Sequence, residues 1–379
     1  MKILAHYHDS TYTPQRRAAK TFGPLGYYRV VKPAEIAESL GHDVTIIGED
    51  ITKFGKNLEE EFNYIFQNYD VFWTGYFTDE KAATAIFYHA QKYHKKVIID
   101  IDDDYLDLPL TNQMYDRFKQ GKRERAFLGT ILSFADVITV STYPLKERIA
   151  AHLRSVYGME KVIVVIPNQN ELAFWETSEK PIFEKDQITI GYSGSNSHQD
   201  DLQMIIPAMA KLMEKYPNLY WKNIGAIQKD LIREYFRGWK DEWMDRVSVG
   251  ACESVFKNYP AWVAQQPWDI AIAPLVDTAF TRCKSHIKWL EYSMYKVPTV
   301  ASRVYPYHMP IDGVPIIEDG KTGLLAANNE WVEKLEMLIT DTDLRKRMGQ
   351  EAYDAVKMNW QYGDENIWGQ RIKNMLENI

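Results

Sequence analysis

Short apolar runs that alternate with amphipathic segments constrain the fold of this chain more than any other feature. In the first half, apolar residues recur at helical spacing at about 30–40, 80–93, 122–134 and 144–157, and these segments predict helices. The apolar runs between them predict strands at 2–6, 44–47, 71–73, 97–101, 137–140 and 162–166. Short buried strands separated by helices indicate a parallel sheet that is covered on both faces.

A polar, charged stretch at 176–187 interrupts this pattern and predicts a linker. Strands are then predicted at 188–192, 219–224, 247–249, 270–273 and from 299 onward. Helices are predicted at about 202–216, 229–236, 261–265, 285–295, 330–339, 342–358 and 365–376. Because 379 residues are long for one core, we predict an α/β fold of two doubly wound, Rossmann-like domains that face a cleft. The predicted parts are 1–178, 186–358 and a C-terminal segment, 359–379.

The composition excludes several classes of protein. A net charge of -7 argues against a general nucleic-acid-binding surface. Two cysteines, Cys252 and Cys283, indicate a reducing compartment rather than a disulfide framework. The first residues lack the apolar core of a secretion signal, and no apolar run approaches the roughly 20 residues of a membrane-spanning helix. We therefore expect a soluble, cytoplasmic protein with no transmembrane segment.

The first candidate site is the loop GPLGYYR at 23–29, which precedes a predicted helix. Glycines let the backbone approach a ligand closely, and a helix N-terminus favours an anion or a polar group. The candidate residues are Gly23, Gly26, Tyr27 and Arg29. The loop is not a GxGxxG fingerprint, so the prediction of a dinucleotide site is weak. An ordinary strand-to-helix turn is an equally good interpretation.

The second candidate is the acidic run DIDDDYLDLP, which ends a predicted buried strand and contains Asp100, Asp102, Asp103 and Asp104. These carboxylates could bind a hard cation such as Mg²⁺, as in a DxD phosphatase, although the hydroxyl expected shortly afterwards is absent. They could instead supply a base or a hydrogen-bond acceptor for a substrate hydroxyl. They could also be solvated charges that cap a helix. The position at the end of a parallel strand favours the second interpretation.

The third candidate is the loop GYSGSNSHQDDL at 191–202, between a predicted strand and a predicted helix. It offers small residues and hydrogen-bond donors that could cradle a phosphate: Gly194, Ser195 and Ser197. His198 could add a donor toward a diphosphate, and Asp200 or Asp201 could cap the helix. Helix capping alone is the alternative interpretation of this loop.

The fourth candidate is the stretch 269–302, where Lys284, Lys288 and Glu291 are spaced four and three residues apart. This spacing predicts that they share one helical face. A cationic face at the mouth of a parallel sheet suits a phosphate-bearing ligand. The surrounding sequence is strongly apolar, so charges there would be costly unless paired. A solvated face, or a structural ion pair between Lys288 and Glu291, is the alternative.

Taken together, these motifs resemble GT-B glycosyltransferases of the large retaining group that includes sucrose and glycogen synthases. Within that group they are similar to glycosyltransferase family four. The resemblance covers nearly the whole chain. The segments that carry it are RVVKPAEIAESLGHDVTII, VITVSTYPLKERI with VIPN, ITIGYSGSNSHQDDL, DIAIAPL, KSHIKWLEYSMYKVPTVAS and the loop DGKTGLLA. The helix that ends near Leu376 resembles the family's terminal helix, which crosses back onto the first domain.

The resemblance implies a nucleotide-sugar donor in the second domain, an acceptor in the first, and retention at the anomeric carbon. The family often carries two glutamates eight positions apart, and the second typically binds the donor's ribose. Glu291 matches the second glutamate, whereas Cys283 occupies the position of the first. Lys284 and Ser285 resemble a lysine-serine pair of some branches, with Lys284 toward the diphosphate. Asp102 stands at about the position of a family histidine that contacts the sugar or the acceptor.

We therefore expect transfer of a sugar from a nucleotide diphosphate to an acceptor hydroxyl on a glycan, a lipid, a protein or a modified base. Asp102, Asp103 and Lys284 are the expected catalytic residues. Lys284, the Gly194–Ser195 backbone and a helix dipole would stabilise the departing diphosphate without a metal ion or another cofactor. The alternatives are a nucleotide-sugar epimerase of the same fold, a non-catalytic nucleotide-sugar binding protein and, least favoured, a metal-dependent phosphatase.

Overall fold

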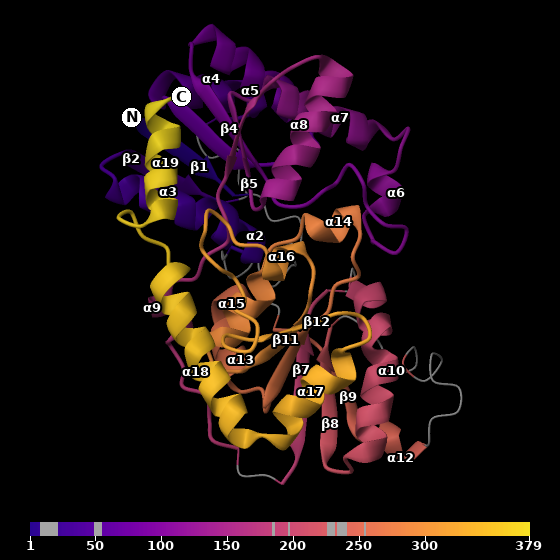
Figure 1. The fold of residues 1–379 in the computed structure, drawn as a ribbon. Coiled ribbons are helices and arrows are strands. Elements are labelled where there is room, and N and C mark those ends of the chain that lie inside the picture. Colours follow the sequence, from indigo (N-terminus) through magenta and orange to yellow (C-terminus); the bar gives the residue numbers. More distant parts are fainter. Residues whose placement is uncertain are drawn as a thin grey trace.

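The computed structural model describes residues 1–7, 22–48, 55–183, 186–195, 198–225, 232, 241–253 and 255–379. All but one residue of the helix predicted at 229–236 lies outside these ranges, as does the loop residue Ser197. The described chain contains two six-stranded parallel sheets, each covered by helices (Figure 1). We refer to each sheet with its helices as the N-terminal and the C-terminal domain.

The N-terminal sheet has the strand order β2-β1-β3-β4-β5-β6. Its strands are β1 (Lys2–His6), β2 (Asp43–Ile47), β3 (Val71–Gly75), β4 (Lys96–Ile101), β5 (Val137–Val140) and β6 (Val162–Val165). Its helices are α2 (Pro24–Gly26), the π-helical turn η1 (Tyr27–Val31), α3 (Lys32–Ser39), α4 (Leu58–Asn68), α5 (Glu80–Lys92), α6 (Tyr115–Phe118), α7 (Arg123–Phe134), α8 (Tyr143–Tyr157) and α9 (Leu172–Trp175). Every strand predicted for this half is confirmed to within two residues, whereas α4 and the short helices were not predicted.

Alternating residues of these strands fill two cores, one on each face of the sheet. Phe72 of β3 belongs to the core beneath α4 and α5, whereas the next residue, Trp73, belongs to the core that contains residues of α3. Ile99 and Ile98 of β4 divide in the same way. A strand alternates its side chains between the two faces of a sheet, so strands buried on both faces have continuous apolar sequences. This is why the apolar runs predicted the strands well.

The C-terminal sheet has the order β12-β11-β10-β7-β8-β9. Its strands are β7 (Ile188–Ser193), β8 (Leu219–Ile224), β9 (Val247–Gly250), β10 (Ile270–Ala273), β11 (Thr299–Ser302) and β12 (Leu324–Ala326). The helices of this half are α10 (Gln199–Lys215), α12 (Asp241–Met244), the 3₁₀ turn η3 (Phe256–Asn258), α13 (Tyr259–Ala264), α14 (Ala279–Arg282), α15 (Ile287–Ser293), α16 (Tyr305–His308), α17 (Trp331–Thr340), α18 (Thr342–Asn359) and α19 (Ile367–Glu377).

Two predictions for this half were wrong. The segment DGKTGLLA, expected to be a loop, ends in the strand β12, which pairs with β11 through Val300 and Leu324. Three residues are too few to show an alternating pattern, so its sequence gave no strand signal. The helix predicted at 285–295 is confirmed as α15 to within two residues, but the helical face predicted for Lys284, Lys288 and Glu291 is wrong, because Lys284 follows the separate short helix α14, which a capping box between Thr278 and Thr281 starts. Lys284 therefore precedes the helix that carries Lys288.

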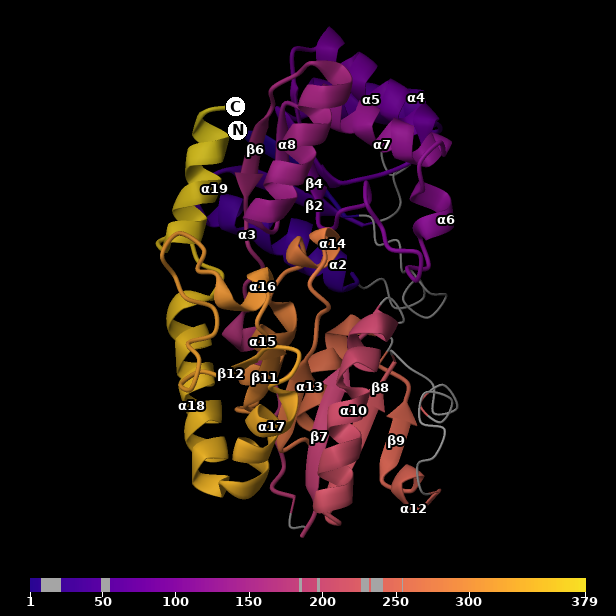
Figure 2. The same ribbon diagram turned by 45° about the vertical axis from the view of Figure 1, so that its right-hand side comes forward.

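The C-terminal helix joins the two domains, in agreement with the predicted fold. In Figures 1 and 2, α18 runs along the C-terminal domain, and α19 continues beside the N-terminal one, against α3. Ile372, Met375 and Leu376 of α19 belong to the same buried cluster as Ile36 of α3. The side chain of Arg371 donates to the carbonyl of Val165 in β6. The last helix thus supplies part of the N-terminal core.

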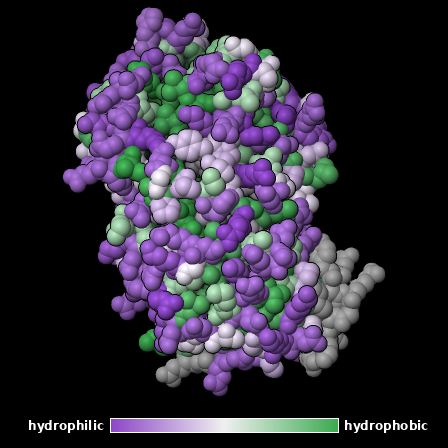
Figure 3. All heavy atoms as spheres, viewed as in Figure 1, coloured by the Kyte–Doolittle hydropathy of each residue, from purple (hydrophilic) through white to green (hydrophobic). Residues whose placement is uncertain are grey.

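The face of the molecule shown in Figure 3 is mainly hydrophilic, with apolar residues in separate patches. Across the described ranges, every helix is too short or too polar to cross a membrane.

Candidate functional site

Two adjoining cavities lie between the domains, at the carboxyl ends of the strands. Their volumes are about 320 Å³ and about 520 Å³, and they share the lining residues Pro24, Ser195, Ile287 and Lys288. We call them the small cavity and the large cavity. In open parallel sheets, ligands bind outside the carboxyl ends of the strands, which is where these cavities are. They form the candidate active site.

Arg29 and Asp100 form the buried support of the small cavity. Both are 2% exposed, and the guanidinium binds the carboxylate through two hydrogen bonds, of 2.8 Å and 3.1 Å. The same guanidinium donates to Oδ1 of Asn168, a lining residue, at 3.0 Å. Removing either partner would leave a buried charge uncompensated, which makes such pairs costly to break. Asp100 therefore has a structural role, and Arg29 positions Asn168 while lining the cavity itself.

Asp102 and Asp103 follow β4 and line the small cavity. Burial and the nearby charges of Asp103 and Asp100 raise the pKa of Asp102 to about 7. Its carboxylate accepts a hydrogen bond from the hydroxyl of Tyr105 at 3.3 Å. A carboxyl with a pKa near neutrality can accept or donate a proton under physiological conditions. This property agrees with the interpretation of the acidic run as a partner for a substrate hydroxyl.

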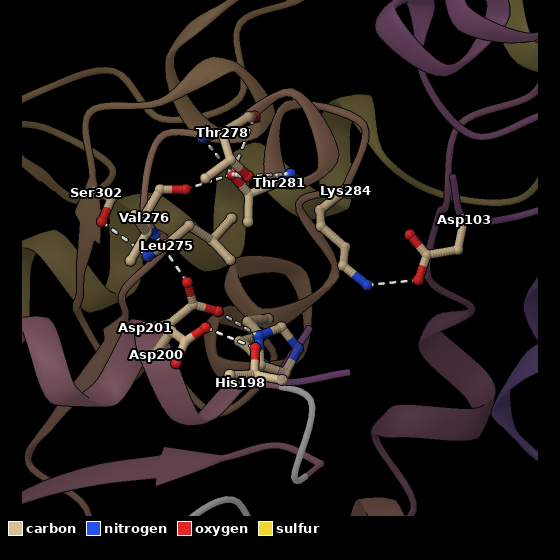
Figure 4. A network of polar contacts seen from close by, with 12 residues as sticks. Asp103, His198, Asp200, Asp201, Leu275, Val276, Thr278, Thr281, Lys284 and Ser302 are labelled. Atoms are coloured by element: carbon tan, nitrogen blue, oxygen red, sulfur yellow. Dashed lines mark hydrogen bonds and ion pairs between the residues drawn. The ribbon is translucent and has the colours of Figure 1, made fainter. Parts of the chain in front are cut away.

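Lys284 reaches across from the C-terminal domain to Asp103 (Figure 4). Its Nζ lies 2.6 Å from Oδ2 of Asp103, and the two side chains are 19% and 15% exposed. The amine also lies over the ring of Phe280, 4.4 Å from its centroid. The ion pair thus connects the loop after β4 with the segment between α14 and α15.

Gly194 follows β7, where the backbone passes close to Lys288. A Cβ atom at position 194 would lie 2.3 Å from the hydroxyl of Tyr192 and 2.9 Å from Nζ of Lys288. A side chain at this position would therefore force Tyr192 and Lys288 to move. Lys288 donates to the carbonyl of Ser193 at 2.9 Å, and burial lowers its pKa to about 8. Lys288 is therefore not a solvated side chain. Among the contacts of the residues that the structure describes, Lys288 forms no direct ion pair with Glu291.

Glu291 lines the large cavity and is buried, at 9% exposed. Its carboxylate accepts hydrogen bonds from Tyr28 at 3.3 Å and from Tyr259 at 3.2 Å. Burial raises its pKa to about 7, although Lys288 and the two hydroxyls act in the opposite direction. A carboxylate that already accepts two hydroxyl groups has the geometry to accept those of a ligand.

His198 occupies the N-cap position of α10 and lines the small cavity. Its Nδ1 lies 2.8 Å from Oδ2 of Asp201 (Figure 4). Asp200 accepts a hydrogen bond from Thr111 at 2.6 Å. Because no side chain caps α10, the suggestion that Asp200 or Asp201 caps this helix was wrong. Both aspartates instead contact other segments of the chain.

The structure brings most of the predicted residues together. Those that line the small cavity are Arg29, Asp102, Asp103, Ser195, His198, Lys284, Ser285 and Lys288. Those that line the large cavity are Gly194, Ser195, Lys288 and Glu291.

The glycine-rich loop contributes less than predicted. Gly23 and Tyr27 line neither cavity. The ring of Tyr27 packs against Phe174 and Phe256, with centroids 4.7 Å and 5.3 Å apart, and its hydroxyl donates to Glu171. Gly26 lines a smaller pocket, together with Asp100 and Asp102. Gly23 and Tyr27 are therefore not placed to contact a ligand in either of these two cavities.

Sequence reasoning missed Tyr28, Asn168 and Tyr259. Tyr28 lies in the quoted loop, and the π-helical turn η1 buries it with Arg29; such turns are frequent at functional sites. Asn168 ends the quoted motif VIPN and donates to Oγ of Ser285 at 2.9 Å. Nothing local marks Tyr259, which contacts Glu291 only through the folding of distant segments.

Cys283 lies outside both cavities. It is 0% exposed, its thiol donates to the carbonyl of Ala279, and burial raises its pKa to about 12. The position matched to the family's first glutamate is thus part of the core. Among the residues that the structure describes, no group of three or more His, Cys, Asp or Glu side chains is placed to hold a metal ion.

No model of a known protein family matches the sequence, and no curated protein is similar to it in sequence. Solved structures are similar in fold. HepE of Anabaena, in complex with UDP and glucose, aligns over 100% of both chains with a TM-score of 0.65 and 13% identity. Sucrose-phosphate synthase of Thermosynechococcus elongatus aligns over 100% of this chain and 98% of its own, with a TM-score of 0.59 and 13% identity.

The pneumococcal O-GlcNAc transferase GtfA, in complex with UDP and GlcNAc, aligns over 86% of this chain and 60% of its own, with a TM-score of 0.53 and 14% identity. At such identities the similarity concerns the fold alone. Together with the two parallel sheets, it confirms the predicted GT-B architecture.

Proposed function

We propose that this protein is a glycosyltransferase that moves a sugar from a nucleoside diphosphate to an acceptor hydroxyl. The observation that carries the proposal is the order of charged groups along the joined cavities. Glu291 lies in the large cavity, Lys288 on the shared wall, and Lys284 beside Asp103 in the small cavity. The nucleoside needs acceptors for its hydroxyls, the diphosphate needs cations, and the sugar needs a mixture of polar groups. The cavities offer these groups in the same order.

The large cavity suits the nucleoside. Phe256 and Tyr259 line it with stacked rings 5.9 Å apart and offer aromatic surface to a base. Glu291 would accept the ribose hydroxyls in place of the tyrosine hydroxyls that it accepts now. Two structures of this fold, HepE and GtfA, contain UDP, which supports testing uridine diphosphate donors first.

The diphosphate would lie between Lys288, Lys284 and the turn at Gly194 and Ser195, near the N-terminus of α10. Charge that develops on the leaving phosphate is stabilised by cations and by oriented backbone groups that are already in place. The proposal needs no metal ion for this step. It includes retention at the anomeric carbon, which rests on the family resemblance. Asp102, with a pKa of about 7, would accept a hydrogen bond or a proton from a hydroxyl in the small cavity.

We assign the donor to residues 186–358, the acceptor side to residues 1–178, and the return helix to residues 359–379. The acceptor belongs to the class of hydroxyl-bearing glycans, lipids, proteins or modified bases. Both cysteines are free thiols, which supports a cytoplasmic location.

A thermal-shift screen tests the donor. A ligand that binds the native state raises its melting temperature, so UDP, GDP and ADP and their sugar derivatives are compared with and without EDTA. We expect one nucleotide to raise the melting temperature and EDTA to leave this effect unchanged. The stabilising sugar nucleotide is then incubated with panels of acceptors, and release of the nucleoside diphosphate should depend on one of them. Absence of any shift by all of these nucleotides would contradict the proposal.

The same reactions separate the other classes of protein. An epimerase would convert the donor to a new sugar nucleotide in the absence of an acceptor. For a non-catalytic binding protein, a sugar nucleotide would raise the melting temperature, but no donor would be turned over. A phosphatase would release inorganic phosphate from monoesters, and EDTA would abolish that activity.

A further inference from the structure

Asp201 holds the imidazole of His198 in one orientation. Nδ1 of His198 lies 2.8 Å from one carboxylate oxygen, and the other oxygen accepts the backbone N–H of Val276 at 2.8 Å (Figure 4). The carboxylate is thus fixed from two sides. Because an ionised carboxylate only accepts hydrogen bonds, Nδ1 carries the proton in this contact.

The second ring nitrogen, Nε2, is consequently an acceptor. Burial and the charge of Lys288 lower the pKa of His198 to about 4, so the imidazole is neutral at pH 7. A neutral imidazole protonated on Nδ1 has a lone pair on Nε2. Within the described parts of the chain, the ring hydrogen-bonds to Asp201 only, which leaves Nε2 for a ligand.

The position of His198 limits which part of a donor it can meet. It lines the small cavity with Asp102 and Lys284, and it does not line the large cavity that contains Glu291. In Figure 4 the ring edge opposite Asp201 is turned toward the side where Lys284 and Asp103 lie. Under the proposed placement of the donor, this cavity holds the sugar, next to the diphosphate that Lys284 and Lys288 contact.

We propose that His198 accepts, through Nε2, a hydrogen bond from a hydroxyl of the transferred sugar, and that Asp201 is the positioning residue that fixes this tautomer. The inference rests on the proposed function and refines it, because the sequence had suggested His198 as a donor toward the diphosphate. Phosphate oxygens only accept hydrogen bonds, so a diphosphate contact would require a proton on Nε2. Because Asp201 already holds the ring proton on Nδ1, that contact would require a second ring proton, which burial of His198 opposes.

The test compares UDP with UDP-glucose and UDP-N-acetylglucosamine by calorimetry, in the wild type and in His198→Ala. We expect the dissociation constant for UDP to change by less than about twofold. The constant for the preferred UDP-sugar should rise by about 5- to 10-fold, the usual effect of one lost hydrogen bond. Equal losses for UDP and the UDP-sugar in this variant would overturn the inference and assign His198 to the diphosphate.

Deoxyfluoro derivatives of the preferred UDP-sugar identify the hydroxyl. Fluorine keeps the size of the group but cannot donate a hydrogen bond, so one derivative should bind the wild type about 5- to 10-fold more weakly. His198→Ala should bind that derivative and the parent sugar nucleotide equally, which is the coupling that a direct contact requires. Independent effects of the two changes would contradict a direct contact.

Asp201→Asn provides a variant of nearly unchanged shape. Its amide can donate to Nδ1 and place the proton on Nε2, which is the tautomer that cannot accept. We expect it to lose affinity for the UDP-sugar while keeping affinity for UDP, with a melting temperature close to that of the wild type. Wild-type affinity for both ligands would overturn the positioning role. If the wild type binds no nucleoside diphosphate sugar at all, the proposed function itself is contradicted. That outcome differs from the preceding ones, in which the wild type binds the sugar nucleotide.

Discussion

At the scale of one residue, the burial of Glu291, a proposed binding residue, makes the stability of the protein depend on pH. Its pKa is raised to about 7 in the folded protein, above the usual value of 4.5, mainly because burial disfavours the charged form. The folded state therefore binds more protons than the unfolded state between these two values. Stability from this group is fully present below pH 4.5 and is lost as the pH rises through about 7.

The first prediction concerns Glu291→Gln, which removes this titration. Between pH 4.5 and 8, the free energy of unfolding of the wild type should fall relative to that of the variant by up to about 3 kcal/mol. Urea denaturation at several pH values measures this difference. Parallel curves for the two proteins would show that Glu291 does not titrate in this range.

The second prediction concerns Lys284, which is proposed to meet the diphosphate. Lys284→Ala should lower kcat by about 10²- to 10³-fold, because one preorganised cation at a leaving group contributes several kcal/mol. The melting temperature should change little, since this ion pair with Asp103 is partly exposed. Lys321→Ala is a control, because Lys321 pairs with Glu318 on the surface and lines neither cavity. Unchanged turnover in Lys284→Ala would remove this lysine from the site.

At the scale of elements, two side chains of the N-terminal domain already hydrogen-bond to the groups that are proposed to bind the donor. Asp103, in the loop after β4, accepts from Lys284, and Tyr28, in η1, donates to Glu291. A donor would have to replace both contacts. The protein thus pairs these groups with side chains that resemble parts of the ligand: a carboxylate for a phosphate and a phenol for a ribose hydroxyl.

The third prediction follows from this competition. Asp103→Asn removes the anion that holds Lys284, so the affinity for UDP should increase by about 3- to 10-fold, as measured by calorimetry. The matched control is Asp107→Asn, in the same loop, because Asp107 pairs with Arg148 instead. A weaker affinity for UDP in Asp103→Asn would mean that Asp103 positions Lys284 for binding and does not compete for it.

The elements differ in how well the sequence predicted them. Strands such as β4 and long helices such as α10 have a repeated apolar pattern, and their predictions were confirmed. β12 has three residues, and α15 begins after an unpredicted short helix, so the face shared by Lys284 and Lys288 was predicted wrongly. The contacts of Lys284 with Asp103 and of Tyr28 with Glu291 join residues 181 and 263 positions apart. Such contacts depend on how the two domains pack, which no local pattern records.

At the scale of the whole molecule, α19 ties the two domains together. Ile372 is fully buried in a cluster with residues of β1, β3 and β4, whereas Ile367 on the same helix is 48% exposed. The fourth prediction is that Ile372→Ala lowers the free energy of unfolding by about 2–4 kcal/mol, through lost burial and a cavity. Ile367→Ala should change it by less than about 0.5 kcal/mol. Chemical denaturation measures both, and equal effects would show that α19 does not complete the N-terminal core.

The crossing of α19 also sets an order of events during synthesis. The strands of the C-terminal sheet lie in one continuous stretch of chain, from β7 to β12, and can assemble as soon as that stretch has left the ribosome. The N-terminal domain is made first, but a part of its core, Ile372, Met375 and Leu376, is made after the entire second sheet. The nascent N-terminal domain therefore leaves the ribosome with an uncovered apolar surface over α3. The domain that is translated first is the last to be completed.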